Sequence, residues 1–342
     1  MMIKKKAFTK FIIAVSLLLA ANFFTSGYCF AQQKWINVDS EFLPLPSNFH
    51  VYKTTDSLNG KPFIAYYAEA KLKDKHFSFT MDTTYKRRLT PIQFFEKNKN
   101  PLLVVNTTFF SFTTNQNLNV VIKEGKLVSY NVHTIAGKGK DTLTYMHPLG
   151  SAIGISKKRK VDVAWLFTDS TKKNPFAIQR AHGVLKDSIL KLNFKYVEKM
   201  TSLVFADVEK KHYKDVIQLK KWKMETALGG GPVLLQNREI KITNNEELKF
   251  TGKSVNDKHP RTCMGYTKDG RLIVMVIQGR FPGIAEGASL AQEAQLLKDL
   301  GCVEALNLDG GGSSCMLING KETITPCDKE GERAVPAVFI IK

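Results

Sequence analysis

A loop near the end of the chain combines polar and small residues in a way that suits a catalytic or binding site. It reads Asn307-Leu308-Asp309-Gly310-Gly311-Gly312-Ser313-Ser314 and lies between the apolar runs 303–306 and 315–318. The first run predicts a strand that holds the Asp309 carboxylate at its end, and three glycines permit positive φ and close approach to a ligand. The serine hydroxyls and backbone N–H groups could receive an anion. A glycine-rich hairpin turn with a solvated aspartate explains the same pattern, so other segments must decide.

Three further segments place polar groups or glycines beside predicted strands. Residues 106–110, from Asn106 to Phe110, follow the apolar run 102–105, and residues 229–232 precede another at 233–235. The segment His259-Pro260-Arg261-Thr262 puts an arginine where a strand begins. If the segments converge, they supply an amide, a guanidinium and a carboxylate to one site. The alternatives are turn geometry for the glycines, a surface salt bridge for Arg261 and a strand-edge position for His259.

Taken together, these segments resemble the phosphodiester glycosidase family over residues 102–341. The resemblance rests on Asn106 with Phe109 and Phe110, on Gly229-Gly230-Gly231-Pro232, on Pro260-Arg261-Thr262 with Gly265, and on a helix leading into residues 307–314. The family usually has glycine after the asparagine, whereas Thr107 and Thr108 stand here. The resemblance implies an enzyme, a hydrolase that cleaves a sugar 1-phosphodiester such as a phosphorylated glycan.

The resemblance also implies roles for single residues. Arg261 would hold the phosphate through bidentate hydrogen bonds, with Arg280 behind it. Asp309 would stabilise the positive charge that develops at the anomeric carbon, attack that carbon, or activate a water molecule to attack it. Because a phosphate diester leaves readily, a strong general acid is less necessary; Glu293 or Glu286 could serve, although we expect Glu293 to be solvated or capping-related. The residues expected to contact the substrate are Asn106, Phe110, Gly230, Gly231, Thr262, Arg280, Asn307, Gly310, Gly311, Gly312, Ser313 and Ser314.

The motifs require no cofactor. Asp309 with loop carbonyls could bind calcium, but the chain has no EF-hand-like ladder of oxygen ligands. Two other functions stay open. One is a non-catalytic glycan- or phosphate-binding envelope protein on the same fold. The other is a metal-dependent phosphodiesterase acting at phosphorus, which would need a cluster of His and Asp ligands that the sequence does not display.

The first 31 residues have the pattern of a secretory signal peptide. Lysines at 4–6 precede an apolar core from Phe11 to Ala21, and a cleavage site follows at Ala31. Because the bulky Tyr28 fits a lipoprotein signal poorly, we expect no lipid anchor at Cys29. No later run approaches the ~20 apolar residues that span a bilayer. We therefore predict an exported protein, periplasmic or extracellular, without a transmembrane segment in the mature chain.

The chain carries a formal net charge of +19, which favours anionic partners. No tract interleaves arginines with aromatic residues as a nucleic-acid face would, so we expect no nucleic acid. Beyond the signal peptide, four cysteines remain: Cys263, Cys302, Cys315 and Cys327. In an exported protein they could form one or two disulfides, or remain buried thiols inside apolar runs.

The elements that must position the site are many short strands and few helices. Ser289 to Gln292 is a capping box, and Leu290, Ala294 and Leu297 form an apolar stripe at helical spacing. The fold class that this predicts is α+β, with a large, mainly antiparallel or mixed β-sheet core and few packed helices. We expect three parts: a signal peptide (1–31), an N-terminal extension with the first strands of the domain (32–100), and a phosphodiester glycosidase-like domain (101–342).

Overall fold

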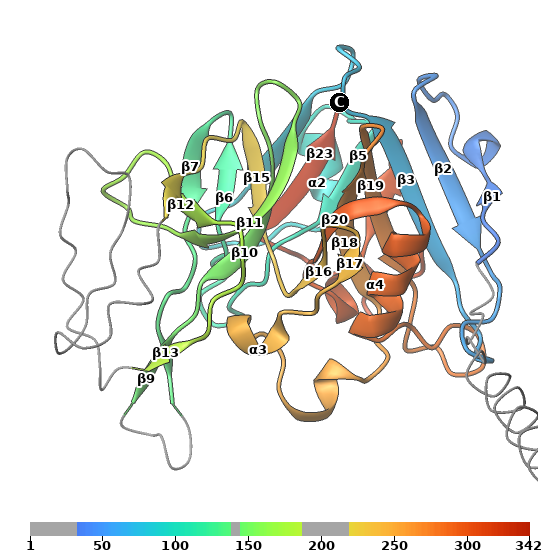
Figure 1. The fold of residues 1–342 in the computed structure, drawn as a ribbon. Coiled ribbons are helices and arrows are strands. Elements are labelled where there is room, and N and C mark those ends of the chain that lie inside the picture. Colours follow the sequence, from blue (N-terminus) through green and yellow to red (C-terminus); the bar gives the residue numbers. More distant parts are fainter. Residues whose placement is uncertain (1–32, 138–143, 187–218) are drawn as a thin grey trace, which may run out of the picture. The chain divides into compact units, whose positions relative to one another are not determined.

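The computed structural model describes residues 33–137, 144–186 and 219–342 (Figure 1). Residues 34–342 form one compact unit. The expected signal peptide, its cleavage site and Cys29 lie outside the described residues, and so does much of the segment 170–225, which has few sequence signals.

The largest sheet has eight strands, and every neighbouring pair in it is antiparallel. Residues 36–71 pair with strands from the last third of the chain, so the expected N-terminal extension contributes strands to the sheet that carries Arg261 and Asn307. The strand order is β1 (Ile36–Asn37), β2 (Phe49–Thr54), β3 (Ala65–Lys71), β19 (Arg271–Ile277), β18 (Arg261–Thr267), β20 (Cys302–Asn307), β16 (Val233–Gln236) and β17 (Glu239–Ile240).

Three smaller sheets complete the described β structure, again with antiparallel pairs. The five-stranded sheet runs β22 (Lys321–Glu322), β21 (Met316–Ile318), β5 (Leu103–Asn106), β23 (Ala337–Ile341), β4 (Phe79–Thr83). The seven-stranded sheet runs β14 (Lys220–Lys221), β12 (Phe176–Ile178), β11 (Val161–Phe167), β10 (Gly150–Ile155), β15 (Thr226–Gly229), β6 (Val121–Lys123), β7 (Lys126–Ser129). The smallest contains β13 (Leu185–Lys186), β9 (Tyr145–His147) and β8 (Ile135–Ala136).

Helices are few in the described chain: α2 (Pro91–Lys97), α3 (Asn244–Glu247) and α4 (Leu290–Asp299), with short 3-10 turns η1 (Asp39–Glu41), η4 (Gly252–Val255) and η5 (Gly311–Ser313). Helix α4 starts at the predicted capping box, in which the Ser289 side chain accepts from the Gln292 N–H. The helix lies against the eight-stranded sheet (Figure 1). Its apolar stripe packs together with Cys263 and Ala305 of that sheet. The predicted α+β class is therefore confirmed.

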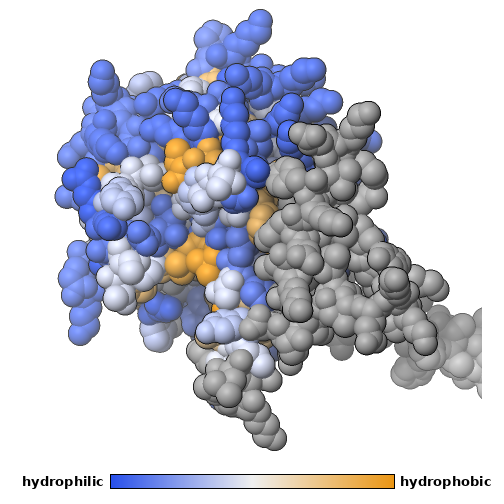
Figure 2. Space-filling view, turned by 90° about the vertical axis from the view of Figure 1, so that its left-hand side faces the viewer, coloured by the Kyte–Doolittle hydropathy of each residue, from blue (hydrophilic) through white to orange (hydrophobic). Residues whose placement is uncertain are grey.

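The main hydrophobic core lies on the other side of this sheet and is shared by three sheets. Met264 and Leu306 from β18 and β20 join Leu103 from β5 and Ile153 from β10 in one buried cluster. This packing brings the ends of β5, β18 and β20 together. The face shown in Figure 2 is largely hydrophilic, with small apolar areas near its centre. Among the described helices, none has the length and hydrophobicity that a membrane-spanning segment requires.

Candidate functional site

The Asp309 loop leaves β20 at Asn307 and is fixed at once against the start of β18. The Leu308 N–H donates to the Thr262 carbonyl at 2.8 Å, and the Gly311 N–H donates to the Pro260 carbonyl at 2.8 Å. A Cβ at Gly310 would lie 2.7 Å from the Pro260 carbonyl oxygen, so a side chain there would push the loop off β18. The antiparallel pairing of β18 and β20 therefore carries the Asp309 backbone beside the start of β18.

Asn106 ties this loop to the five-stranded sheet. Its side chain is fully buried, and its Nδ2 donates to the Asp309 carbonyl at 2.6 Å. Its Oδ1 accepts from the Thr262 hydroxyl at 2.8 Å and from the Cys315 N–H at 3.1 Å. The Asp309 N–H donates to the Thr107 carbonyl at 2.8 Å. Asn106 and Thr262, expected to contact substrate, thus hold together the ends of three strands.

The Asp309 carboxyl group is partly buried, and burial raises its pKa to about 7. The Ser313 hydroxyl, the charge of Arg333 and the Gly310 N–H oppose this rise. Arg333 lies beside the glycines and donates to both oxygens of Asp328, at 2.7 and 2.9 Å. Sequence reasoning did not identify Arg333, because it lies in a charged loop with no motif. A carboxyl that titrates near neutrality can exchange a proton with a substrate or with water.

Arg261 begins β18 and is almost completely buried, with 2% exposed. Its Nε donates to the Ala288 carbonyl at 2.9 Å and one terminal nitrogen donates to the Asp257 carbonyl at 3.1 Å. The guanidinium lies over the Phe250 ring at 5.6 Å. Burial lowers the pKa of Arg261, and the charge of Glu293 opposes this shift. Two of its five N–H donors are thereby committed within the protein.

Glu293 on α4 differs from the expectation that it would be solvated. It is fully buried, because α4 turns it toward Cys263 and Arg261 rather than toward solvent. Burial raises its pKa to about 7, while Arg261 and the Cys263 thiol lower it. Helical spacing carries this signal, because Glu293 lies three residues after Leu290 and four before Leu297, on the same face of α4 as the apolar stripe.

The backbone N–H groups of the loop 229–232 are not free to bind a ligand. The N–H groups of Gly229, Gly230 and Gly231 donate to the carbonyls of Val120 at 2.8 Å, Ser151 at 3.1 Å and Asn307 at 2.8 Å. We expected these groups to bind phosphate oxygens, but they stabilise the fold instead. Gly230 is needed because a Cβ there would collide with the Asn307 carbonyl.

Several buried polar atoms near these strand ends have no hydrogen-bond partner among the described residues. They are Asn307 Oδ1, Ser314 Oγ, His259 Nδ1 and both oxygens of Glu293, which has only the nearby Cys263 thiol. The other end of the Asn307 amide is fixed, since its Nδ2 donates to the Gly231 carbonyl at 2.7 Å. Buried polar atoms in folded proteins nearly always have partners, so such a group of exceptions marks a place for water or ligand.

Arg280 is exposed and lies against the Asp309 loop. Its backbone has φ of +65°, and its guanidinium would lie 3.0 Å from a Cβ placed on Gly311. One terminal nitrogen also lies 3.7 Å from Cys327 Sγ. Arg280 therefore presents a cation over the glycines, as expected for a residue that contacts an anionic substrate.

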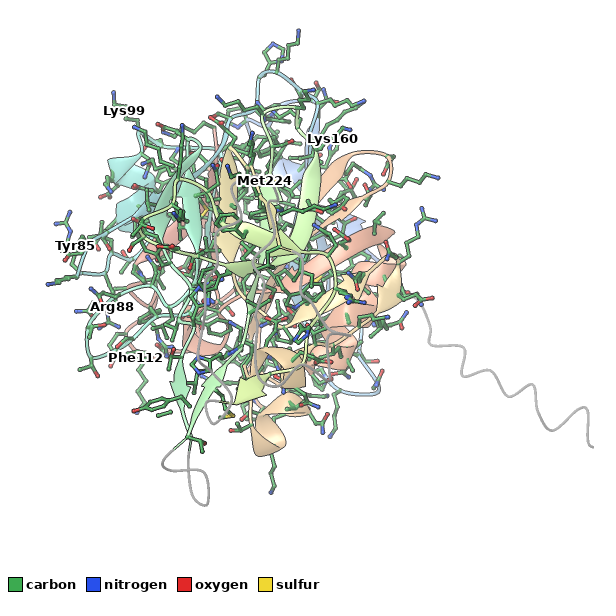
Figure 3. All side chains as sticks on the ribbon, turned by 60° about the vertical axis from the view of Figure 1, so that its left-hand side comes forward. Tyr85, Arg88, Lys99, Phe112, Lys160 and Met224 are labelled. Carbon is green, nitrogen blue, oxygen red and sulfur yellow. The ribbon has the colours of Figure 1, made fainter. Side chains whose placement is uncertain are left out.

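Phe110, by contrast, is buried in a small core cluster and is covered by its neighbours. The rings of Phe110 and Phe112 are 4.8 Å apart, and the Arg88 guanidinium lies over both. Phe112 itself is 63% exposed, and Arg333 also lies over its ring at 5.4 Å. Tyr85, Arg88 and Phe112 point outward on one side of the protein (Figure 3). The exposed aromatic ring beside Arg333 is thus Phe112 rather than Phe110.

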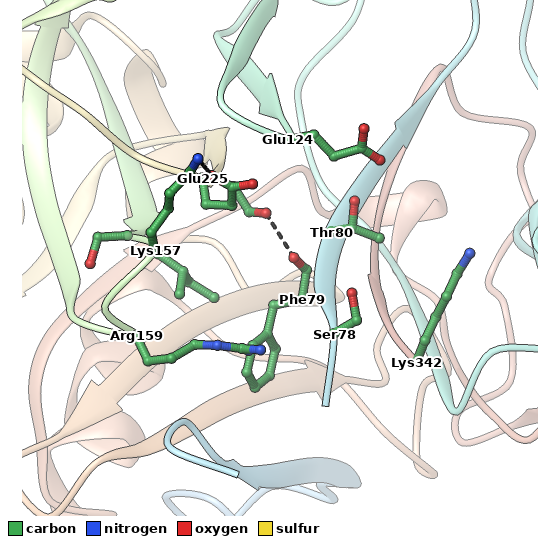
Figure 4. Close-up of a pocket in the computed structure, with 11 residues that line it drawn as sticks. Ser78, Phe79, Thr80, Glu124, Lys157, Arg159, Glu225 and Lys342 are labelled. Carbon is green, nitrogen blue, oxygen red and sulfur yellow. Dashed lines mark hydrogen bonds and ion pairs between the residues drawn. The ribbon is translucent and has the colours of Figure 1, made fainter. Parts of the chain in front are cut away.

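A separate cavity of about 490 Å³ contains none of the predicted site residues (Figure 4). Three of its charged groups are engaged within the protein. Lys157 lies 3.7 Å from Glu225, and Arg159 donates to the Phe77 carbonyl at 2.6 Å while its guanidinium covers the Phe79 ring. We therefore do not assign the reaction to it.

The described residues contain no group of three or more His, Cys, Asp or Glu side chains placed to hold a metal ion. Cys263, Cys302, Cys315 and Cys327 are free thiols, the first three buried. Of the two alternatives for the cysteines, the structure thus has the buried thiols.

Comparison with known proteins assigns the chain to a family. The sequence model of a family described as Phosphodiester glycosidase matches residues 161–342, more than half of the chain. The mouse and human proteins named N-acetylglucosamine-1-phosphodiester alpha-N-acetylglucosaminidase are 30% identical over 99 residues and 33% identical over 109 residues. These matches cover 29% and 30% of this chain, but only 19% and 21% of the relatives.

A solved structure extends the similarity in fold. The catalytic domain of the zebrafish protein of the same name aligns with a TM-score of 0.52 at 20% identity, covering 91% of this chain and 88% of that domain. At this identity the alignment establishes the fold alone. It nevertheless includes most of the chain, whereas the matches to the curated mouse and human relatives span about a fifth of their length.

Proposed function

Since the chain belongs to the phosphodiester glycosidase family, we propose that it hydrolyses a sugar 1-phosphodiester at the Asp309 loop. The prediction of a phosphodiester glycosidase-like hydrolase is confirmed at the level of the family. The observation that carries the proposal is that one loop contains both Asp309, whose pKa burial raises to about 7, and the unpartnered buried atoms of Asn307 and Ser314.

In the proposed reaction the bond between the anomeric carbon and the phosphate oxygen breaks, and a phosphomonoester leaves. Water supplies a hydroxyl group to the anomeric carbon, and its remaining proton is released. The ionised Asp309 carboxylate stabilises the oxocarbenium-like transition state, attacks it, or accepts the proton of water. Arg280 and the uncommitted donors of Arg261 hold the phosphate, because planar guanidinium groups bind phosphate oxygens in pairs. The charge of Glu293 opposes the lowering of the Arg261 pKa by burial.

We take the substrate for the first test from the names of the relatives, which specify N-acetylglucosamine 1-phosphodiesters. We also propose that the protein acts outside the cytoplasm, with residues 1–31 as a signal peptide and residues 32–100 and 101–342 as the two parts of the mature chain. Calcium stays a candidate ligand of Asp309 that a chelator can test.

The test is hydrolysis of the methyl diester of N-acetylglucosamine 1-phosphate by the purified protein in ¹⁸O-labelled water. We expect equal amounts of free sugar and methyl phosphate, with the label in the sugar. Asp309→Asn should lower kcat/KM at least about a thousandfold, as removal of a catalytic group does in other hydrolases. Asp269→Asn, at an exposed turn, is the control and should have full activity.

Other results would contradict the proposal in recognisable ways. Label in the phosphate, with loss of activity on adding a chelator, would indicate a metal-dependent phosphodiesterase acting at phosphorus. Binding of the diester without turnover would indicate the non-catalytic glycan- or phosphate-binding protein.

A further inference from the structure

A cavity of about 300 Å³ has in its wall none of the residues assigned to the reaction proposed above. Its walls are mostly apolar and include Phe109, Leu118, Val132, Ile135, Leu248 and Lys249. Phe109 follows closely on Thr107, whose carbonyl accepts the Asp309 N–H, so the cavity and the loop share one segment of chain. The volume is at the lower end of the roughly 300–1,000 Å³ typical of small-molecule sites.

The Lys249 side chain reaches this cavity in an unusual state. Its stem packs so closely on the glycine loop that a Cβ at Gly231 would lie 2.5 Å from Lys249 Cε. The ammonium lies over the Phe109 ring, 5.4 Å from its centre. Among the described residues, no carboxylate lies within ion-pair distance of it and no side chain or carbonyl accepts its protons. Partly buried cations usually have such partners, so the ammonium is left to bind something else.

Glu247 is the nearest candidate to neutralise Lys249, but its carboxylate is fully used within the protein. One oxygen accepts from the Thr243 hydroxyl at 2.6 Å, the Val233 N–H at 3.0 Å and the Trp165 indole at 3.1 Å. The other accepts from the Ser151 hydroxyl at 2.6 Å and its N–H at 3.3 Å. Burial lowers the pKa of Lys249, and the charge of Glu247 opposes this shift from a distance without contacting the ammonium.

The two amides in the cavity wall are also committed. Asn131 accepts from the Val120 N–H and donates to the carbonyls of Gly150 and Leu166. Asn119 accepts from the Phe109 N–H at 3.1 Å and donates to the Gly230 carbonyl at 3.4 Å. Lys249 is thus the charged group that the described cavity wall leaves available to a ligand.

A pair of aromatic rings connects Lys249 to the phosphate-binding candidate. Phe109 and Phe250 form an edge-to-face pair with centroids 5.9 Å apart, and Arg261 lies over the Phe250 ring at 5.6 Å. Two cations therefore lie at opposite ends of one aromatic pair. A substrate whose phosphate binds Arg261 and whose second acidic group binds Lys249 would place one negative group beside each cation.

We propose that Lys249 and Phe109 form a subsite for an acidic sugar unit, whose carboxylate or phosphate binds the Lys249 ammonium and whose C–H groups pack on the apolar wall. The inference rests on the proposed function and specifies its substrate class as a phosphodiester of an acidic glycan. An apolar cavity with one cation disfavours a neutral sugar, because nothing there replaces the water that solvates Lys249.

The test is titration calorimetry with glucuronate, glucose 6-phosphate and glucose on the full chain carrying Asp309→Asn, which prevents turnover. We expect at least one of the two acidic sugars to bind about tenfold more tightly than glucose. Lys249→Met removes the charge at similar length and should abolish this preference, whereas Lys249→Arg should retain it. Lys253→Met, at an exposed lysine nearby, should change nothing. Comparison of the two acidic sugars distinguishes carboxylate from phosphate.

Equal affinities of the parent and Lys249→Met proteins for the acidic sugars, with both variants folded by circular dichroism, would overturn the proposal. So would equal binding of glucose and both acidic sugars by the parent. Neither measurement requires catalysis. A wild-type protein that fails to cleave any sugar 1-phosphodiester would refute the proposed function and would leave the binding result intact.

Discussion

Two carboxylates near the glycine loops, Glu247 and Asp309, have opposite surroundings. Glu247 is 2% exposed and accepts five hydrogen bonds from four residues of neighbouring segments. Asp309 has fewer donors, is partly accessible, and has a pKa that burial raises to about 7. One carboxylate is completely solvated by protein dipoles, and the other is left poorly stabilised in its ionised form.

The difference indicates which carboxylate maintains the fold and which is available for chemistry. A buried carboxylate whose lone pairs are all satisfied is a structural element, since any reaction there would first break its hydrogen bonds. A carboxylate that titrates near neutrality, beside unpartnered atoms of Asn307 and Ser314, can change its charge during a reaction. The comparison therefore predicts that substitutions at the two positions affect different properties.

Glu247→Gln should have the largest effect on stability. The amide retains one acceptor oxygen, but its NH₂ group faces N–H and O–H donors, so several hydrogen bonds to a charged group are lost. We expect a loss of about 3 kcal/mol in the free energy of unfolding, the scale for one such bond together with unpaired donors. Urea unfolding measures it, with Glu239→Gln on the exposed strand β17 as the control. A loss below about 1 kcal/mol would show that Glu247 is not structural.

Asp309→Asn should change stability in the opposite direction, and only at high pH. The ordinary pKa of the carboxyl is 3.8, and the folded value is about 7. Between these values the folded protein keeps a proton that the unfolded chain has released, so stability falls as pH rises from about 4 to 7 and the penalty is complete above 7. The amide never ionises. At pH 8 the variant should therefore unfold at a higher temperature. Because the carboxyl group is partly exposed, we expect the gain in the free energy of unfolding to be on the order of 1 kcal/mol, less than the full shift in pKa would give.

Thermal unfolding of both proteins at pH 4, 6 and 8 tests this prediction. The unfolding temperatures of the two proteins should be equal at pH 4, and the difference between them should grow as the pH rises. Glu293 contributes the same pH dependence to both proteins, so it cancels in the difference. A constant difference at all three pH values would mean that the folded protein does not raise the pKa of Asp309.

Local signals made much of the fold predictable. The capping box at Ser289 and the Asn319-Gly320 turn between β21 and β22 define their elements through neighbours in sequence. Long-range pairing was less accessible: β3 and β4 are consecutive along the chain, yet they belong to different sheets.

The site was predictable where a motif exists and not where burial decides. Asp309, Arg261 and Asn106 have sequence signatures, and the structure brings their backbones together at the ends of β20, β18 and β5. Lys249 and Arg333 have none, because their surroundings come from segments distant along the chain. A lysine or arginine in a charged loop is usually solvated, and only packing reveals the exceptions.

Arg333→Gln offers the finest test of the comparison, because it changes the electrostatic environment of Asp309 without touching the fold around Glu247. The charge of Arg333 lowers the pKa of Asp309, so its removal should raise that pKa further. If the ionised carboxylate is the active form, the acid limb of the profile of kcat/KM against pH moves to higher pH. We expect a shift on the order of half a unit, because the Arg333 side chain is 25% exposed and is paired with Asp328.

Arg333→Lys should keep the limb in place, and Asp328→Asn should move it toward lower pH by freeing the guanidinium charge. An acid limb that ignores all three changes would mean that some group other than Asp309 controls the reaction.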